Sequence, residues 1–162
     1  MTTAITGSCF CKTVQYRIKS AISMAVNCHC NNCKKISGGA FASLAVVREK
    51  HLEITSGEES LATYQLSENL KKHFCSRCGT KLFLTFERFP GAVGVYGGTF
   101  DDPNWYERSP VTTKHIFLSV AMTGTMVPAG FNCFDEHAMT RDGIAIEPHR
   151  FEAVETLGPR KP

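Results

Sequence analysis

The sequence predicts a mainly β fold built from antiparallel sheets, and three observations support this class. Residues 14–18 alternate between apolar and polar side chains, which is the period of a strand with one buried face. Helical periodicity is weak, and its best segment, residues 31–37, is stopped by Gly38 and Gly39. Short apolar runs rich in Val, Phe and Tyr predict further strands at residues 41–47, 81–86, 92–100 and 115–120.

The length of 162 residues fits one domain with a real core, which we expect over residues 1–155, followed by a short tail over residues 156–162. A hydrophobic content of 43% and a charged content of 20% argue against disorder. No apolar run approaches the roughly 18 residues that span a bilayer, and residues 1–10 lack a secretory signal. We therefore expect a cytoplasmic protein. The mild, scattered net charge of +3 argues against nucleic acid as a partner.

The eight cysteines are mostly clustered in the sequence, which is not the distribution of a disulfide framework. Disulfides spread their cysteines so that the bridges close long loops, whereas clustered thiols in a reducing compartment indicate metal binding or redox chemistry. Only Cys133 stands alone in the sequence. The other seven fall into three clusters: Cys9 with Cys11, then Cys28, Cys30 and Cys33, then Cys75 with Cys78.

The first and third clusters together offer four sulfurs, which is the ligand set of a closed, tetrahedral structural zinc site. If Cys9 and Cys11 lay in a strand, both sulfurs would point to one side. Residues 75–78 form a Cys-x-x-Cys knuckle, and Gly79 after it can take a positive φ without steric cost.

The middle cluster, Cys28, Cys30 and Cys33, can place three thiolates around one ion and leave its fourth position open. Three protein ligands with an open position are typical of a catalytic zinc. The spacing does not fit a ferredoxin run or a Rieske centre, and no βαβ pattern supports a thioredoxin-like site.

The three clusters occur in a fixed order with characteristic neighbours. Residues 7–11 read Gly-Ser-Cys-Phe-Cys, residues 28–33 read Cys-His-Cys-Asn-Asn-Cys, and residues 74–80 read Phe-Cys-Ser-Arg-Cys-Gly-Thr. In this order the chain resembles the glutathione-dependent formaldehyde-activating enzyme (GFA) family, which also includes the domain of centromere protein V. The resemblance runs from about residue 7 to residue 120, with further matches at Ser37, Gly38, Phe41, residues 98–103, Pro110 and His115.

The resemblance implies a β-tent fold of packed antiparallel sheets with two zinc ions per chain. It also implies the family's activity, a carbon–sulfur lyase reaction that interconverts glutathione plus formaldehyde and S-(hydroxymethyl)glutathione, with a small thiol or aldehyde adduct as partner. Carried over residue by residue, it assigns a structural zinc to Cys9, Cys11, Cys75 and Cys78, and a catalytic zinc to Cys28, Cys30 and Cys33.

Some positions depart from the family's pattern. Lys12 stands where the family usually has Gly, and residues 119–122 lack the basic and tryptophan residues often found there. Residues 130–150 match no landmark of the family. These departures leave the substrate open.

For the mechanism, our hypothesis is that the open zinc brings the aldehyde and the thiol together. Three negatively charged thiolates reduce the Lewis acidity of the zinc ion. Carbonyl activation and thiol exchange at the zinc therefore both remain alternatives. Lys34, Lys35 or Arg48 could meet the carboxylates of glutathione, but we interpret them as solvated surface charges.

Several other residues have a structural interpretation. His29 is interpreted as a packed side chain or one that contacts a metal ligand, rather than as a ligand itself, and His73 as unneeded by an ion that four sulfurs already satisfy. His115 is interpreted as a packed histidine rather than a proton shuttle, and Asp101 with Asp102 as part of a turn. Cys133 is interpreted as a buried free thiol; as a fourth ligand to the middle cluster it would instead close that site.

Two classes of function therefore remain, a zinc enzyme and a non-catalytic zinc module that mediates protein interaction. A non-catalytic module of the centromere type would depend on a basic or disordered extension, of which this sequence has almost none. The enzyme is therefore favoured. The oligomeric state, a homo-oligomer included, is left open.

Overall fold

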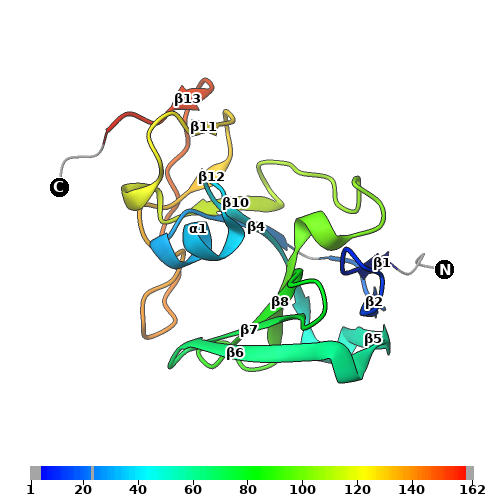
Figure 1. Cartoon of the computed structure of the whole chain (residues 1–162). Coiled ribbons are helices and arrows are strands. Elements are labelled where there is room, and N and C mark those ends of the chain that lie inside the picture. The colour runs from blue at the N-terminus through cyan, green and yellow to red at the C-terminus, as the bar shows by residue number, and fades with distance from the viewer. Residues whose placement is uncertain (1–4, 23, 160–162) are drawn as a thin grey trace. The chain divides into compact units, whose positions relative to one another are not determined.

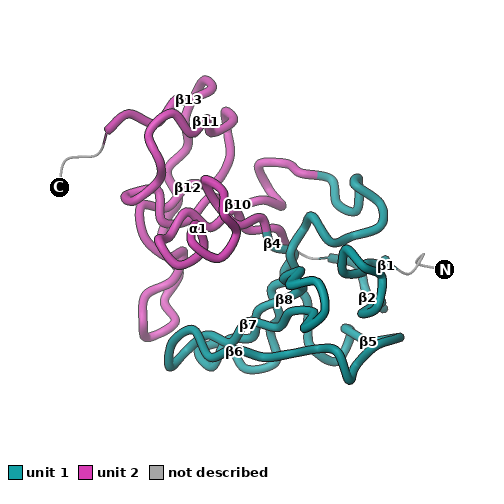
Figure 2. The backbone as a smooth tube through the Cα atoms, in the orientation of Figure 1, with its two compact units in different colours: residues 1–23, 44–107 teal, residues 24–43, 108–162 magenta. Residues whose placement is uncertain are grey.

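The computed structural model describes residues 5–22 and 24–159. The chain divides into two compact units, residues 1–23 with 44–107 (unit 1) and residues 24–43 with 108–162 (unit 2) (Figure 2). Strands outnumber helices in both units, which confirms the mainly β class (Figure 1). None of the helices in the described residues is both long and apolar enough to cross a membrane. A single domain over residues 1–155 stays a prediction.

Unit 1 contains a three-stranded antiparallel sheet in the order β1-β2-β5. These strands span Ile5–Ser8 (β1), Gln15–Ile18 (β2) and Leu52–Ser56 (β5). Along β2 the side chains of Tyr16 and Ile18 are buried while Gln15 and Arg17 are exposed, so the alternation in the sequence marks the two faces of this strand as expected.

The second sheet of unit 1 is antiparallel and runs β4-β9-β8-β7-β6. Both of its faces are covered near β8 and β9, because Leu82 and Leu84 on one face and Val93 and Val95 on the other are all fully shielded from solvent. The run predicted over residues 92–100 is a strand only to Tyr96, because the chain then turns into a 3-10 helix at Gly97–Thr99. The strands are Ala42–Arg48 (β4, whose first two residues belong to unit 2), Leu61–Ser67 (β6), Leu70–Cys75 (β7), Lys81–Phe86 (β8) and Ala92–Tyr96 (β9).

Unit 2 departs from the antiparallel expectation. Strand β10 (Thr113–Ile116) lies parallel to both β3 (Met24–Cys28) and β12 (Asn132–Cys133). Parallel neighbours need a long connection, and more than eighty residues of chain separate β3 from β10. The strand expected over 115–120 ends at Ile116, because Phe117 takes a φ of 61° and a 3-10 helix follows at Leu118–Val120.

The helix α1 spans Asn31–Ser37, as the sequence predicted. Cys30 caps its N-terminus by accepting a hydrogen bond from the backbone N–H of Cys33, and Gly38 ends it in the left-handed conformation at φ 70°. Cys33 and Ile36 form its buried face.

The last strand of the described residues pairs within unit 2. Strand β13 (Glu155–Thr156) pairs with β11 (Met126–Val127), and Leu157 is buried against a cluster of Leu118, Val127 and Cys133. Burial of the Leu157 side chain holds this part of the chain to unit 2. The expected tail over residues 156–162 stays a prediction. Residues 160–162 of the expected tail lie outside the described residues.

Candidate metal centres

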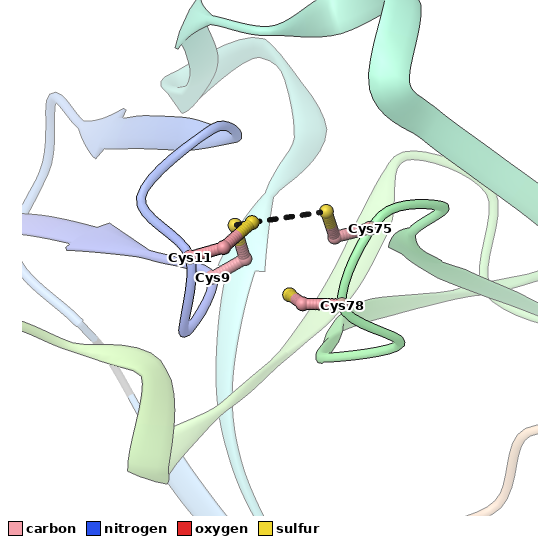
Figure 3. Close-up of side chains that lie close together, drawn as sticks. All are labelled: Cys9, Cys11, Cys75 and Cys78. Atoms are coloured by element: carbon pink, nitrogen blue, oxygen red, sulfur yellow. Dashed lines mark hydrogen bonds between the residues drawn. The ribbon is translucent and has the colours of Figure 1, made fainter.

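The structure brings the first and third cysteine clusters together in unit 1. The Sγ atoms of Cys9, Cys11, Cys75 and Cys78 all lie within 4.8 Å of one another (Figure 3). The Sγ of Cys11 is 3.5 Å from that of Cys9 and 3.8 Å from that of Cys75. Four sulfurs about 2.3 Å from a tetrahedral zinc would be about 3.8 Å apart. The four thiols therefore fit a single ion.

Cys9 and Cys11 lie in a turn rather than in a strand, which corrects the expectation for this pair. Strand β1 ends at Ser8, and the backbone N–H of Lys12 donates to the carbonyl of Cys9 at 2.9 Å. The turn points the two thiols to the same side and leaves the ring of Phe10 89% exposed. Lys12 closes the turn with a φ of 61°, the left-handed region in which glycine is favoured.

Cys75 and Cys78 come from the knuckle between β7 and β8. The backbone N–H of Gly79 donates to the carbonyl of Cys75 at 2.8 Å, and Gly79 has the expected positive φ, 74°. The knuckle faces the turn of Cys9 and Cys11 (Figure 3), and the backbone N–H of Phe10 donates to Oγ1 of Thr80 at 3.1 Å.

Burial and hydrogen bonding shift the pKa values of Cys9, Cys11 and Cys78 in different directions. Burial raises the pKa of the Cys9 thiol to about 11. A hydrogen bond with Thr80 lowers the pKa of Cys78 to about 5, and a hydrogen bond with Thr13 lowers the pKa of Cys11. The cluster thus presents thiolate, the form that binds metal, at neutral pH.

The middle cluster forms in unit 2. Cys28 is the last residue of β3, Cys30 caps α1 and Cys33 lies in its first turn. Their Sγ atoms lie within 4.8 Å of one another, and no fourth histidine, cysteine or carboxylate of the described residues joins them. Cys28 and Cys33 are buried while Cys30 is partly exposed, so the group opens toward solvent at Cys30.

The pKa values of the three thiols in this cluster shift in opposite directions. Hydrogen bonds with Cys28 and Cys33 lower the pKa of Cys30 to about 2. The hydrogen bond with Cys30, together with burial, raises the pKa of Cys28 to about 12, and hydrogen bonds with Cys28 and Cys30 raise the pKa of Cys33. Soft thiolate ligands suit zinc, and the donor set therefore fits a thiolate-bound ion.

His29 is fully buried and lies outside the group of ligands. Its Nε2 is 3.2 Å from Nδ1 of His115, and Nε2 of His115 is 3.3 Å from Nδ2 of Asn27. Sequence reasoning did not single out Asn27. The only signal was its position two residues before His29, on the same face of an extended segment.

The remaining candidates lie away from the cysteine sulfurs. The imidazole of His73 lies between the hydroxyls of Thr63 and Thr85, at 3.1 and 3.0 Å. Arg48 is exposed at the end of β4 in unit 1. Cys133 is a buried free thiol outside both clusters, and Asp101 with Asp102 begins a turn. Lys34 and Lys35 line a hollow in unit 2.

A mainly β chain with one four-thiol and one three-thiol cluster belongs to the class of proteins that could bind two thiolate-ligated metal ions. The family model described as "Glutathione-dependent formaldehyde-activating enzyme" matches residues 4–120. The chain therefore belongs to this family.

Two relatives carry the name "Putative glutathione-dependent formaldehyde-activating enzyme". The relative from Halomonas elongata is 30% identical over 101 residues, which cover 59% of this chain and 64% of that protein. The relative from Fusarium vanettenii is 26% identical over 104 residues, which cover 61% of this chain and 56% of that protein. The chain thus spans about three-fifths of the length of these curated relatives.

A solved structure shares the fold over part of the chain. The crystal structure of a Rhodobacter sphaeroides protein is similar with a TM-score of 0.52 and 25% sequence identity. The similarity covers 59% of this chain and 87% of that one.

Proposed function

We propose that this protein catalyses the reversible addition of a small thiol to formaldehyde, with glutathione as the thiol and S-(hydroxymethyl)glutathione as the product. In the forward direction the thiol sulfur forms a bond to the aldehyde carbon. The π electron pair of the carbonyl moves to oxygen, which takes up the proton that the thiol loses. The reverse step cleaves the carbon–sulfur bond, which makes the enzyme a lyase.

The observation that carries this proposal is the three-thiol cluster, which opens toward solvent at Cys30. In our assignment Cys28, Cys30 and Cys33 hold a catalytic zinc with one position free for substrate. When bound there, zinc supplies Lewis-acid polarisation of an oxygen or a site for a thiolate. Cys28 and Cys33 anchor the group in the core, and the partly exposed side of Cys30 is where a reactant can approach.

The four-thiol cluster supports a different role. Cys9, Cys11, Cys75 and Cys78 use all four positions of a tetrahedral ion, so in our assignment they hold a structural zinc. This ion would tie the turn after β1 to the knuckle after β7, sixty-four residues apart at Cys11 and Cys75. All eight cysteines are free thiols, which supports a reducing compartment such as the cytoplasm.

The first test measures zinc content. Purified protein should hold about two zinc ions, and Cys30→Ser should reduce the content to about one with the fold retained. Cys133→Ser is the matched control, since it changes a cysteine outside both clusters. Unfolding of the Cys30→Ser protein would contradict the assignment, because the three-thiol site would then be structural.

The second test measures the reaction. Magnetisation-exchange NMR on formaldehyde with glutathione should show faster exchange in the presence of the zinc-loaded protein than without it. The Cys30→Ser protein should lose this acceleration. An exchange rate equal to the spontaneous one would remove this substrate pair.

A further inference from the structure

One face of α1 borders a hollow of about 550 Å³ in unit 2. The wall from the helix consists of residues at positions i, i+3, i+4 and i+7, which lie on one face of a helix. Met122, which follows the 3-10 helix at Leu118–Val120, contributes a wall from another part of the chain. The lining residues are Asn31, Lys34, Lys35, Gly38, Gly39, Ala40 and Met122.

One lining residue of the hollow, Asn31, is the chain neighbour of the three-thiol cluster. Asn31 directly follows Cys30, the least buried of the three cysteines. Lys34 is four residues after Cys30, and its backbone N–H donates to the carbonyl of Cys30 at 3.0 Å. Cys30 therefore lies on the same side of α1 as the wall of the hollow.

The hollow carries positive charge that no acidic side chain offsets. Its lining contains two lysines and no carboxylate. Within the part of the chain that the structure describes, no ion pair includes Lys34 or Lys35. The ammonium group of Lys34 donates to the carbonyl of Val120, which holds that charge in place. Lys35 is exposed and can meet an anion.

The remaining walls are small or apolar. Gly39 and Ala40 add little bulk, and a Cβ at Gly39 would meet only Oγ of Ser37 and the carbonyl of Phe41, both 3.8 Å away. Met122 is 51% exposed and adds an apolar side. A ligand with a carboxylate and a short, mostly uncharged body matches this combination.

We propose that this hollow binds a carboxylate of the thiol substrate and that Lys35 is its cationic partner, which makes Lys35 a specificity-determining residue for carboxylate-bearing thiols. The inference rests on the proposed function. Lys34, held by Val120, fixes the wall and adds to the positive potential. The sulfur of the same ligand then lies toward Cys30, at the other end of the hollow.

The test uses S-methylglutathione, which keeps the carboxylates of glutathione and has no free thiol to react. Calorimetry on the zinc-loaded protein should detect its binding, and Lys35→Glu should weaken it about tenfold or more, with Lys35→Gln between the two. Lys50→Gln, an exposed lysine in unit 1, is the matched control and should bind like the unchanged protein. Equal binding by the Lys35→Glu protein would overturn the inference.

A steric variant tests the place of binding independently of charge. Gly39→Leu adds bulk at the wall of the hollow and should also weaken the binding of S-methylglutathione, whereas Gly158→Leu, where a Cβ meets nothing within 4 Å, should not. Unchanged binding by the Gly39→Leu protein would place the ligand elsewhere. Inorganic phosphate and free glycine are then compared as competitors of S-methylglutathione. If phosphate competes as effectively as the carboxylate of glycine, the hollow is a general anion site and the carboxylate assignment is overturned.

Kinetics separate this inference from the proposed function. If the protein accelerates formaldehyde exchange with glutathione, the KM for N-acetylcysteamine, a thiol without a carboxylate, should be higher than the KM for glutathione. Lys35→Glu should raise the KM for glutathione and leave the KM for N-acetylcysteamine unchanged. Acceleration with no such difference between the two thiols contradicts the role of Lys35. No acceleration with any thiol contradicts the proposed function, while the binding of S-methylglutathione still decides whether the hollow takes a carboxylate.

Discussion

His29 and His115 stack in the interior of unit 2, with Nε2 of His29 3.2 Å from Nδ1 of His115 and an angle of 27° between the rings. With Asn27 as donor to Nε2 of His115, the proton of His115 lies on Nδ1 and is donated to His29. His115 thus fixes the ring of His29, the residue between Cys28 and Cys30 in the sequence. A residue well outside the cysteine cluster in sequence therefore holds the segment that carries two of its thiols.

The first prediction concerns His115 as a positioning residue. His115→Ala removes the partner of a buried ring and leaves a cavity, so the free energy of unfolding should fall by about 3 kcal/mol. A chelator should also remove zinc faster from the three-thiol site, with the four-thiol site unchanged. His149→Ala changes a half-exposed histidine of the same unit and serves as the control. Equal loss of zinc from both sites would mean that His115 has only a general structural role.

The second prediction concerns pH. Burial, with a smaller effect of the charge of Arg108, lowers the pKa of His115 to about 4. Other groups against its ring are His29, Phe41 and Phe131. An unperturbed histidine titrates near 6.5 and is about nine-tenths protonated at pH 5.5, so the unfolded chain binds a proton that the folded chain does not. Stability from this group is therefore present above pH 6.5 and is lost as pH falls toward 4.

Proton NMR of the imidazole C2 position checks this expectation. The His115 signal should not shift between pH 7.5 and 5.5, with zinc content measured at each pH so that loss of metal is not mistaken for titration. The pH dependence of the unfolding free energy should be flatter in His115→Gln. A midpoint near 6.5 for the His115 signal would contradict the burial of a neutral ring.

The cysteine clusters could be predicted from the sequence because each set of ligands is local. A Cys-x-x-Cys knuckle or a Cys-x-Cys-x-x-Cys run brings its sulfurs together with a few backbone torsions, and the helix at residues 31–37 follows from its glycine stop. The conformation of Cys9 and Cys11 could not be predicted in the same way, because a strand and a turn can both aim two sulfurs to one side.

The pairing in unit 2 was not predictable either. Cys28 lies opposite Ile116 and Asn27 opposite His115 in a parallel register that joins distant parts of the chain. No periodicity in residues 24–28 or 113–116 specifies that partner, since parallel and antiparallel strands share the same alternation. The Asn27–His115–His29 hydrogen bonds depend entirely on this register.

The third prediction concerns Lys12, whose φ of 61° is costly for any residue with a Cβ. Its ammonium group donates to Oγ of Ser8 at 2.9 Å and lies 3.4 Å from the carboxylate of Asp101. Both Lys12→Ala and Lys12→Gly lose these contacts, but only glycine relieves the backbone strain. Denaturant unfolding should therefore find Lys12→Gly more stable than Lys12→Ala by about 1 kcal/mol. The reverse order would mean that the turn opens when the lysine is removed.

The fourth prediction concerns Cys133, which is fully buried and whose pKa burial raises to about 11. Both properties suppress thiolate, so iodoacetamide at pH 8 should not modify Cys133 in the folded, zinc-loaded protein.

Cys133→Ser places a hydroxyl among Leu118, Val127 and Leu157, and we expect a loss of about 1–3 kcal/mol in unfolding free energy. Cys133→Ala, which lacks the polar group, separates this effect from the loss of volume. Neither variant should change the zinc content, because Cys133 lies outside both clusters. Loss of one zinc in both variants would make Cys133 a fourth ligand of the three-thiol site and would close the position that the proposed reaction needs.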